Sequence, residues 1–466
     1  MTSPDEASPL PGDGPRAASD TVPGPRLARP FSGLHYQPAS VRLERVTAAA
    51  PDLWDTEFVV GQRGRDPHNV IHLLAPLLSS TTPPDGPGAA AQLVSQWLND
   101  GVLSTDTDPA MYLYAYGTPG QMHRGLVVDL PAGEPGGAPL MPHEEVSAAT
   151  VQRQLDLIDA TNAQFEPILV VIQGSMTYHQ LLDQVMTLRP LWRFQSEDGA
   201  DHAIWAIRSP EMVAQLADLT AGIPMLLADG HHRYVALQRS LARPVRSPGD
   251  GREHMQQAVA TGPDTRPGTG PRRPPGAVVM LMDADHDGLR LGSIQRVVRG
   301  LDWERVLSTP GVTVAEITGA EQALTLLAPR AHGDGAVGAV DGAVGAETDQ
   351  AVITDGRRWV SLTVRAEGQG HPATVVSEPS AAPELAVCQL HARWLPAWRL
   401  GAHAVTYVHD VARAVSLATD TGGMAVLLSP PPVDAVFATA GRGGVLPHKA
   451  TSFGPKPRIG VMMRQW

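Results

Sequence analysis

The feature that most constrains the fold is a short apolar run that leads through a polar turn into a helix. Residues 223–227 (Ile-Pro-Met-Leu-Leu) have the length and composition of a buried strand. Tyr234, Leu237 and Leu241 follow at the spacing of one helical face. The motif Asp229-Gly-His-His-Arg233 therefore lies between a strand and a helix, which favours an α/β fold, with α+β as the alternative.

Strand and helix patterns recur on both sides of this junction. Apolar runs and alternating residues predict further strands at 111–116, 124–130, 167–172 and 202–207. Helical spacing of apolar residues predicts helices at 91–98, 151–158 and 382–394. Which strand pairs with which does not follow from these patterns.

Proline- and glycine-rich segments divide the chain into blocks. Residues 1–29 have no hydrophobic periodicity and are expected to form a disordered tail before an α/β domain at 30–242. Residues 243–276 contain Pro-Gly and Arg-Arg-Pro-Pro and predict a linker or a disordered insertion. A second mixed α/β domain is expected at 277–466, interrupted by a repetitive Gly-Ala-Val loop at 331–347 that we expect to be disordered.

Charge and composition exclude several classes of function. The formal net charge of −12 gives no basis for general nucleic-acid binding, because such binding begins with a basic surface. The single cysteine cannot form an intrachain disulfide, and no basic region precedes an apolar stretch at the N-terminus. No apolar run approaches the ~20 residues of a membrane span. We therefore expect a cytoplasmic protein without a membrane partner, of unknown oligomeric state.

The polar turn combines groups that bind phosphate. Gly230 allows a left-handed turn and close approach of a ligand to the backbone. The helix that follows offers unpaired N–H groups to an anion, and Arg233 adds a bidentate fork. His231 and His232 can exchange protons near neutral pH, and Asp229 can bind Mg²⁺ or act as a base. The alternative is structural, with Asp229 capping the helix and the histidines making ordinary polar contacts.

A second candidate is the segment Pro142-His-Glu-Glu145, which precedes a predicted helix. His143 can serve as a base and Glu144 as a metal ligand. The alternative is that acidic residues near the start of the helix simply stabilise its dipole.

A third candidate lies close to the C-terminus. Lys449 and Lys456 are the only lysines of the chain, and all 34 other basic residues are arginine. Their segment, residues 447–458, also contains Arg458, two hydroxyl side chains and a glycine, a composition that suits phosphate. A solvated basic loop is the alternative.

With these residues the chain resembles the family of domain of unknown function 1015. The resemblance runs from about residue 31 to the C-terminus and skips the 243–276 and 331–347 segments. It rests on Asp66-Pro-His-Asn-Val70, Pro109-Ala-Met-Tyr-Leu-Tyr114, Pro142-His-Glu144, Asp159-Ala-Thr-Asn162, Glu197-Asp-Gly199, Ala228-Asp-Gly-His-His-Arg-Tyr234, Arg296-Val-Val298 and residues 449–458. Many members have Pro-Pro-Tyr-Asp where this chain has Pro51-Asp-Leu-Trp-Asp55, so the role of that turn is not carried over.

The central turn is also similar to the Asp-Gly-His-x-Arg motif of the ParB/sulfiredoxin-like superfamily. That superfamily binds nucleotides and includes free-serine kinases and CTP-hydrolysing chromosome-partition proteins. The resemblance implies a ParB/sulfiredoxin-like core in the N-terminal domain. It also implies that residues 229–233 bind nucleotide phosphates and Mg²⁺. We expect Asp229 and Glu144 to be metal ligands and Arg296 and Arg458 to be among the nucleotide contacts.

Together these features favour a Mg²⁺-dependent phosphotransferase that uses ATP or ADP and acts on a small hydroxyl metabolite such as serine. Such a reaction needs clustered positive charge, a metal ion and a base for the attacking hydroxyl. Arg233, Lys449 and Lys456 would hold phosphate, with Asp229 as metal ligand or base and Glu144 as the alternative base. The alternatives are a nucleotide-sensing regulator without turnover and a phosphatase or nucleotide hydrolase. All of them require the C-terminal lysines to fold back onto the turn.

Overall fold

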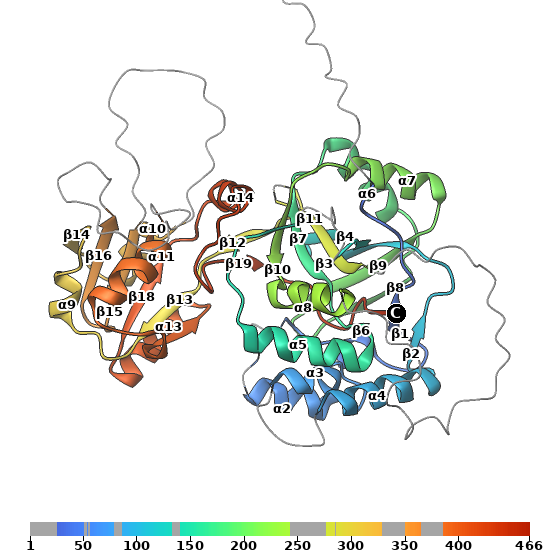
Figure 1. The fold of residues 1–466 in the computed structure, drawn as a ribbon, viewed down its shortest axis with the longest axis horizontal. Helices are drawn as coiled ribbons and strands as arrows, with labels where there is room; N and C mark the ends of the chain where they lie inside the picture. Colours follow the sequence, from blue (N-terminus) through green and yellow to red (C-terminus); the bar gives the residue numbers. More distant parts are fainter. Residues whose placement is uncertain are drawn as a thin grey trace, which may run out of the picture.

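The computed structural model describes residues 26–50, 54, 56–78, 86–132, 140–242, 276–284, 286–328, 350–364 and 385–466. They form a larger and a smaller lobe (Figure 1). Most of the expected tail, nearly all of the expected 243–276 linker and the whole 331–347 loop lie outside the described residues. The ordered part begins before residue 30, because the backbone of Arg29 pairs with that of Asp129.

The larger lobe is built around an eight-stranded mixed sheet. Its strand order is β5-β10-β7-β11-β4-β3-β9-β8. The strands are β3 (Met111–Thr118), β4 (Gln121–Leu130), β5 (Leu140–Pro142), β7 (Ile168–Ile172), β8 (Trp192–Gln195), β9 (Asp201–Ile207), β10 (Met225–Asp229) and β11 (Ala277–Asp283). The strands predicted around residues 111, 124, 167, 202 and 223 correspond to β3, β4, β7, β9 and β10.

Strand β11 lies in the middle of this sheet. It pairs antiparallel with β4 and parallel with β7, and all its residues are buried. The sequence analysis expected a second domain to begin at residue 277, whereas the structure assigns this strand to the first sheet. The reason is physical: a continuous apolar run indicates a strand covered on both faces, but it does not indicate which sheet contains the strand.

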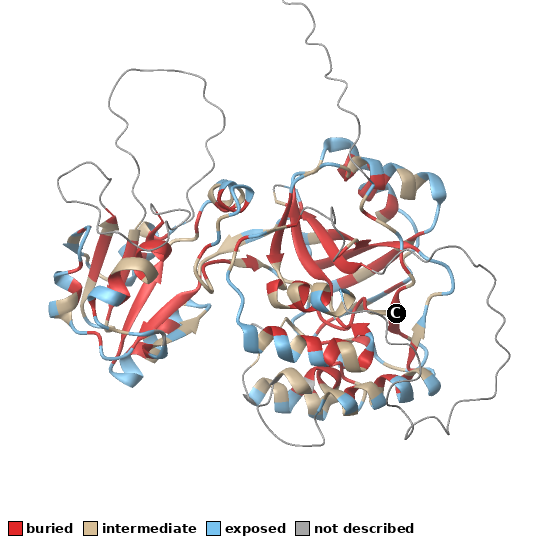
Figure 2. Cartoon of the chain, viewed as in Figure 1, coloured by how far each residue is buried: buried red, intermediate tan, exposed pale blue. Residues whose placement is uncertain are grey.

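Two layers cover the large sheet. One face packs against α5 (Ala148–Thr161), α6 (Met176–Met186), α7 (Pro210–Leu219) and α8 (His231–Leu241). The other face forms a second apolar cluster with α1 (Leu43–Val46) and residues 446–463. α3 (Ile71–Leu78) and α4 (Pro87–Asn99) contribute to that cluster and pack against α5, with α2 (Thr56–Arg65) beside α3. Figure 2 shows the strands buried and the outer faces of the helices exposed. Each buried Val, Leu or Ile side chain contributes about 1.5–3 kcal/mol, so alternate strand residues hold both layers.

The smaller lobe is a six-stranded antiparallel sheet with helices around it. Its order is β14-β16-β15-β18-β13-β17. The strands are β13 (Gln295–Val298), β14 (Val312–Glu316), β15 (Gln350–Thr354), β16 (Trp359–Val364), β17 (Val405–Val408) and β18 (Met424–Leu428). The helices are α9 (Trp303–Leu307), α10 (Ala320–Leu326), α11 (Ala386–Gln389), a π-helical turn (Leu390–Trp394), α12 (Leu395–Ala397), a 3₁₀ turn (Ala402–Ala404), α13 (Val411–Thr421) and α14 (Val433–Gly441).

The C-terminal segment returns to the larger lobe and ties the two lobes together. β19 (Ser452–Gly454) pairs with β12 (Arg290–Gly292), and β20 (Arg464–Gln465) pairs with β6 (Ala163–Gln164). Further backbone bridges join Leu446 to Glu144 and Met463 to Leu34 of β1 (Leu34–Tyr36), which itself pairs with β2 (Leu103–Thr105). The molecule is therefore a mixed α/β protein, as expected. No helix in the described part of the chain has both the length and the apolar composition needed to cross a membrane.

Candidate functional site

Within the polar turn, residues 229–233, a single residue separates the strand from the helix. Strand β10 ends at Asp229 and helix α8 begins at His231, so Gly230 makes the change of direction. Gly230 has a φ of 93°, in the left-handed region that disfavours side chains. A Cβ added to Gly230 would also lie 2.9 Å from Nη2 of Arg233. Both the backbone and the packing of the arginine therefore require glycine.

Asp229 is held between two cations. Its Oδ1 accepts a hydrogen bond from Nζ of Lys456 at 2.5 Å, and its Oδ2 accepts one from Nη2 of Arg233 at 2.8 Å. Although burial by itself raises the pKa of this carboxyl, Lys456 and Arg233 outweigh burial and hold the pKa well below its usual value. Asp229 is therefore ionised at neutral pH, and the C-terminal segment does fold back onto the turn.

The guanidinium of Arg233 forms hydrogen bonds and ion pairs with other groups of the protein. Its side chain packs under the turn, and the residue is 8% exposed. Besides Asp229, its guanidinium donates to the carbonyl of Pro167 at 3.0 Å and lies 3.2 Å from Oε1 of Glu166. The sequence analysis expected a phosphate fork here, but these contacts make Arg233 a tie between β10, α8 and the start of β7.

His143 is buried with both ring nitrogens engaged. Its Nδ1 donates to the carbonyl of Leu227 at 2.8 Å, and its Nε2 lies 2.7 Å from Oγ1 of Thr451, whose hydroxyl can donate to it. Burial lowers the pKa of His143 to about 4, so the ring is neutral at neutral pH. A base would need a nitrogen that faces the substrate, so this geometry suits a positioning residue rather than the base expected from sequence.

His231 and His232 bind the loop that carries Glu144. The backbone N–H of His143 points at Nε2 of His231, at 3.4 Å, and that of Ser147 donates to Nε2 of His232 at 2.9 Å. Burial lowers the pKa of His231 well below its usual value and that of His232 to about 4. Both rings are therefore neutral acceptors that fasten this loop to the start of α8.

Glu144 is a titratable group of the 142–145 segment whose pKa lies near neutrality. Its Oε1 accepts a hydrogen bond from the backbone N–H of Lys449 at 2.8 Å and lies 3.5 Å from Nδ1 of His448. Burial raises the pKa of Glu144 to about 7, although the N–H and the charge of Lys449 act to lower it. A carboxyl in this state can accept or release a proton at neutral pH.

Lys449 is presented by a strained backbone that Arg296 supports. Lys449 has a φ of 60°, a left-handed conformation that is uncommon for a residue with a side chain. Nη2 of Arg296 donates to the carbonyl of Lys449 at 2.8 Å, and the guanidinium lies over the ring of Tyr407. Burial lowers the pKa of Arg296 to about 10. Arg296, fully buried, therefore holds the Lys449 loop from behind instead of contacting a ligand directly.

Arg458 makes its hydrogen bonds and ion pairs with residues outside the turn. Its Nη2 donates to the carbonyl of Thr47 at 3.0 Å and lies 3.1 Å from Oε2 of Glu197. It borders a small depression of about 10 Å³ that Arg233 and Lys456 also line. Its contacts are those of a buried structural arginine.

A polar cavity of about 70 Å³ is lined by residues of both lobes. From the sequence-predicted set it is lined by Glu144, Asp229, Gly230, His231, His232, Lys449 and Lys456. His143, Arg233 and Arg296 do not line the cavity, but each contacts a residue that does. Arg458 does not line it either and contacts Thr47 and Glu197 instead. The structure thus brings three distant segments to one site.

Other lining residues escaped the sequence analysis. His448, Thr451 and Ser452 lie in the C-terminal segment that the lysines had already indicated, so their positions carried a partial signal. His409 and Ile294 come from the smaller lobe and lie in no motif. Such residues can be assigned to the site only from the three-dimensional structure, which shows that the C-terminal segment folds back between the lobes.

Several solved structures resemble this chain in fold, with low TM-scores. Free serine kinase in complex with AMP is 13% identical, covers 71% of this chain and 87% of its own, and gives a TM-score of 0.33. SbnI from Staphylococcus aureus, with a C-terminal truncation, is 11% identical, covers 71% and 84%, and gives a TM-score of 0.35. A conserved hypothetical protein from Pyrococcus furiosus is 12% identical, covers 71% and 90%, and gives 0.32. Scores this low carry no conclusion about function.

Sequence comparison is more decisive. No functionally curated protein matches the chain. A family model, described as Protein of unknown function (DUF1015), matches residues 28–377. That span is most of the chain and contains the large sheet, the Glu144 loop and the polar turn. The chain therefore belongs to the DUF1015 family.

Proposed function

We propose that the cavity binds the phosphate groups of a nucleotide and that the protein transfers a phosphoryl group to the hydroxyl of a small metabolite, with serine-like compounds as the leading class. One observation carries the proposal: the start of α8, the chain's two lysines and a carboxyl with a pKa near 7 meet in one cavity. Anion-binding groups and a proton acceptor are two of the requirements of this chemistry.

Positive charge in the cavity favours an anion. The first N–H groups of a helix lack intrahelical partners and form the positive end of its dipole, and α8 begins in the cavity wall. Lys449 and Lys456 add two ammonium groups, although the chain as a whole carries a formal charge of −12. The limited volume suits phosphate groups, so the nucleoside would extend outward between the lobes.

Glu144 is proposed as the general base. The hydroxyl oxygen of the acceptor forms a bond to the terminal phosphorus while the bond from that phosphorus to its bridging oxygen breaks. The hydroxyl proton passes to Glu144, and the shortened nucleotide (ADP from ATP, or AMP from ADP) leaves with the electron pair of the broken bond. A base whose pKa is close to the working pH contributes about 10²–10⁴-fold to the rate.

Mg²⁺ does not fit Asp229 as the sequence analysis expected. Both carboxylate oxygens of Asp229 accept hydrogen bonds from cations, Lys456 and Arg233, and a metal ion would have to displace one of them. Oε1 of Glu144 is likewise occupied by the backbone N–H of Lys449. The role that these contacts support for Asp229 is to orient Lys456 toward the phosphates.

The remaining predicted residues fit supporting roles in this proposal. His231 and His232 fasten the Glu144 loop to α8, and Arg296 sets the backbone of Lys449. A ParB/sulfiredoxin-like reading of the turn is consistent with these roles, because the Asp-Gly-His-x-Arg motif it shares belongs to nucleotide-binding proteins.

The test is a direct assay of the purified full chain. The protein would be incubated with ATP, ADP or CTP, MgCl₂, and serine or pooled hydroxyl metabolites, and the products identified by mass spectrometry and ³¹P NMR. A phosphorylated metabolite formed in proportion to nucleotide consumed is the expected result. Loss of nucleotide without a phosphorylated metabolite would make the protein a hydrolase, and binding without turnover would make it a sensor; either outcome overturns the transfer step.

A charge variant separates specific phosphate binding from general attraction. Lys449→Met keeps the length of the side chain and removes a cation from the cavity, so nucleotide affinity should fall about tenfold or more, since a hydrogen bond to a charged group contributes about 1.5–3 kcal/mol. Arg239→Ala removes an exposed cation from the far end of α8 and should leave affinity unchanged. Equal effects of the two changes, measured by calorimetry, would remove the cavity as the binding site.

A further inference from the structure

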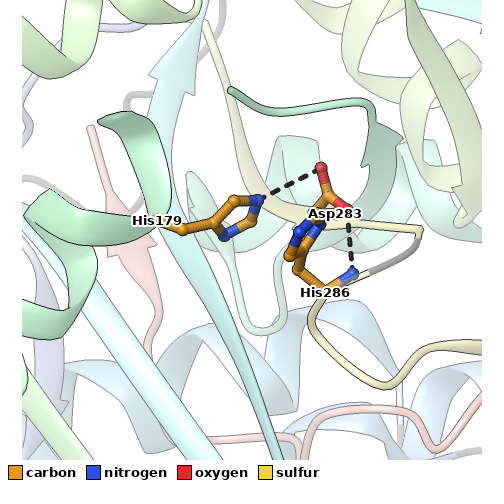
Figure 3. Close-up of side chains that lie close together, drawn as sticks. All are labelled: His179, Asp283 and His286. Carbon is orange, nitrogen blue, oxygen red and sulfur yellow. Dashed lines mark hydrogen bonds and ion pairs between the residues drawn. The ribbon is translucent and has the colours of Figure 1, made fainter. Parts of the chain in front are cut away.

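A second cluster of donor side chains lies at the opposite end of strand β7 from the cavity. His179 belongs to α6, Asp283 is the last residue of β11, and His286 follows shortly after it (Figure 3). β7 and β11 run parallel, with Ile172 paired to Asp283, so the cluster lies just beyond the carboxyl ends of two parallel strands. Ligands of open α/β sheets characteristically bind at such ends.

The donor atoms are spaced like the ligands of one metal ion. Nε2 of His179 lies 3.5 Å from Oδ2 of Asp283, and Nδ1 of His286 lies 3.2 Å from Oδ1. One ligand atom from each of the three residues can be chosen so that all lie within 4.8 Å of one another. Two ligands at about 2.1 Å from a tetrahedral ion lie about 3.4 Å apart, so small side-chain movements suffice to close the site.

The buried imidazole of His179 is the strongest indication that an ion or ligand binds at this cluster. The residue is 3% exposed, yet neither of its ring nitrogens makes a hydrogen bond within the described residues. A buried polar group without a hydrogen bond costs about 1–3 kcal/mol. The 3.5 Å approach to Asp283 is too long to meet this need, and a metal ion bound to Nε2 would meet it.

The surroundings hold Asp283 in place as metal-ligating carboxylates are usually held. The backbone N–H groups of Gly174 and His286 donate to its oxygens, and its own N–H donates to Asp287 at 2.8 Å. A Cβ on Gly174 would lie 3.1 Å from Oδ2 of Asp283 and 3.3 Å from Nε2 of His179. Glycine therefore leaves space beside the two donor atoms, and the hydrogen bonds fix the carboxylate.

Charge also favours a cation. The side chains of Asp283 and Asp287 are 2% and 0% exposed, and Arg124 lies 3.1 Å from Asp287 while also pairing with Asp183. Buried carboxylates are stabilised by a positive charge close to them. A divalent ion beside Asp283 supplies that charge.

We propose that His179, Asp283 and His286 bind one divalent transition-metal ion of the zinc class, with at least one coordination position open to water or a ligand. Two imidazoles and a carboxylate are a zinc-type donor set, whereas Mg²⁺ and Ca²⁺ select oxygen donors. The rings of His179 and His286 stack at 4.1 Å, so binding turns one of them. The side chain of His286 is 45% exposed and has room to turn and to admit the ion from solvent.

The experiment is a zinc titration of the full chain after removal of metals with a chelator. Calorimetry should show one tight Zn²⁺ site, and Co²⁺ in its place should give the visible absorption of a tetrahedral complex. His286→Ala and His179→Gln should each weaken Zn²⁺ binding at least about 100-fold, and Gly174→Ala about 10-fold, because supporting contacts of a metal site contribute about 10–100-fold.

Matched controls locate the ion. His403→Ala removes an exposed histidine from the smaller lobe, and His448→Ala removes one from the cavity; both should keep the tight Zn²⁺ site. Wild-type affinity in His286→Ala, loss of binding in His448→Ala, or preference for Mg²⁺ over Zn²⁺ would each overturn the proposal. Because the readout is metal binding and not turnover, its outcome is independent of the proposed phosphoryl transfer.

Discussion

The polar cavity and the His179–Asp283–His286 cluster lie at opposite ends of strand β7. On either side of β7, strands β10 and β11 each end in an aspartate. Asp229 is opposite Leu169 near the start of β7, and Asp283 is opposite Ile172 at its end. The same residue type, at the same place on a strand, thus faces two different environments.

The partners of each aspartate decide the charge of the ligand that can bind there. Around Asp229 the partners are cations, Lys456 and Arg233, so the carboxylate is already neutralised and the remaining positive charge attracts an anion. Among the described residues, the imidazoles of His179 and His286 lie close to Asp283 and offer nitrogen lone pairs. That end of β7 suits a cation. The comparison yields predictions that separate the two ends.

The largest expected effect concerns the base in the cavity. Glu144→Gln keeps the shape and the hydrogen bond to Lys449 but cannot accept a proton, so kcat for phosphoryl transfer should fall about 10²–10⁴-fold with nucleotide affinity nearly unchanged. In the wild type, kcat should rise with pH through about 7, as Glu144 loses its proton. Glu145→Gln, at the exposed neighbouring position, serves as the control in steady-state assays from pH 5.5 to 8.5. Unchanged kcat in Glu144→Gln would assign the base elsewhere.

The two aspartates should differ in what their removal does to stability. Asp229→Ala leaves Lys456 and Arg233, with side chains 13% and 10% exposed, beside each other without the carboxylate between them. The free energy of unfolding should fall by about 3 kcal/mol, the loss expected when one partner of a buried ion pair is removed.

Asp283→Ala should cost less, about 1–2 kcal/mol, because it removes the acceptor of backbone N–H groups and not the carboxylate of a buried ion pair. Urea unfolding followed by tryptophan fluorescence measures both. Equal losses in metal-free protein would contradict the view that cations surround one aspartate and neutral donors the other.

The contrast also explains what could be predicted from sequence. The turn at residues 229–233 was recognisable because its strand, glycine and helix are contiguous, and the two lysines stood out through composition. The role of Arg233 was not, because a guanidinium that binds phosphate and one that binds Asp229 and Glu166 look the same in a sequence. His179 and Asp283 are more than a hundred positions apart, and only the pairing of β7 with β11 brings them together.

Acid should lower the stability of the folded protein through the buried histidines at the cavity. Burial lowers the pKa of His143 and His232 to about 4 and that of His231 well below its usual value, so the unfolded chain binds protons at a higher pH than the folded one. Stability should therefore decline as pH falls from about 6.5 to about 4. Glu144 acts in the opposite direction, because its folded-state pKa of about 7 lies above the unfolded value, and it offsets part of the decline.

A single histidine is enough to test this. His232→Gln retains an acceptor for the N–H of Ser147 but does not titrate, so its unfolding free energy should depend less steeply on pH between 6.5 and 4.5 than that of the wild type. His403→Gln, at an exposed position, should leave the slope unchanged. Identical slopes in all three proteins would mean that protonation of His232 does not contribute to acid unfolding.

The smallest expected effect is the coupling between the two ends of β7. A ligand that binds the folded state at 100 times its Kd stabilises it by about 2.7 kcal/mol. Saturating nucleotide and saturating Zn²⁺ should each raise the unfolding free energy, and together they should give the sum to within about 0.5 kcal/mol, as sites without shared partners do. The two clusters share no side-chain contact among the described residues, so additivity is expected.

Nucleotides bind Zn²⁺ and would obscure the result, so inorganic phosphate at matched ionic strength is the better anion for the combined measurement. A deviation of more than 1 kcal/mol would mean that β7 transmits binding from one aspartate to the other, and the two ends would then have to be treated as a single site.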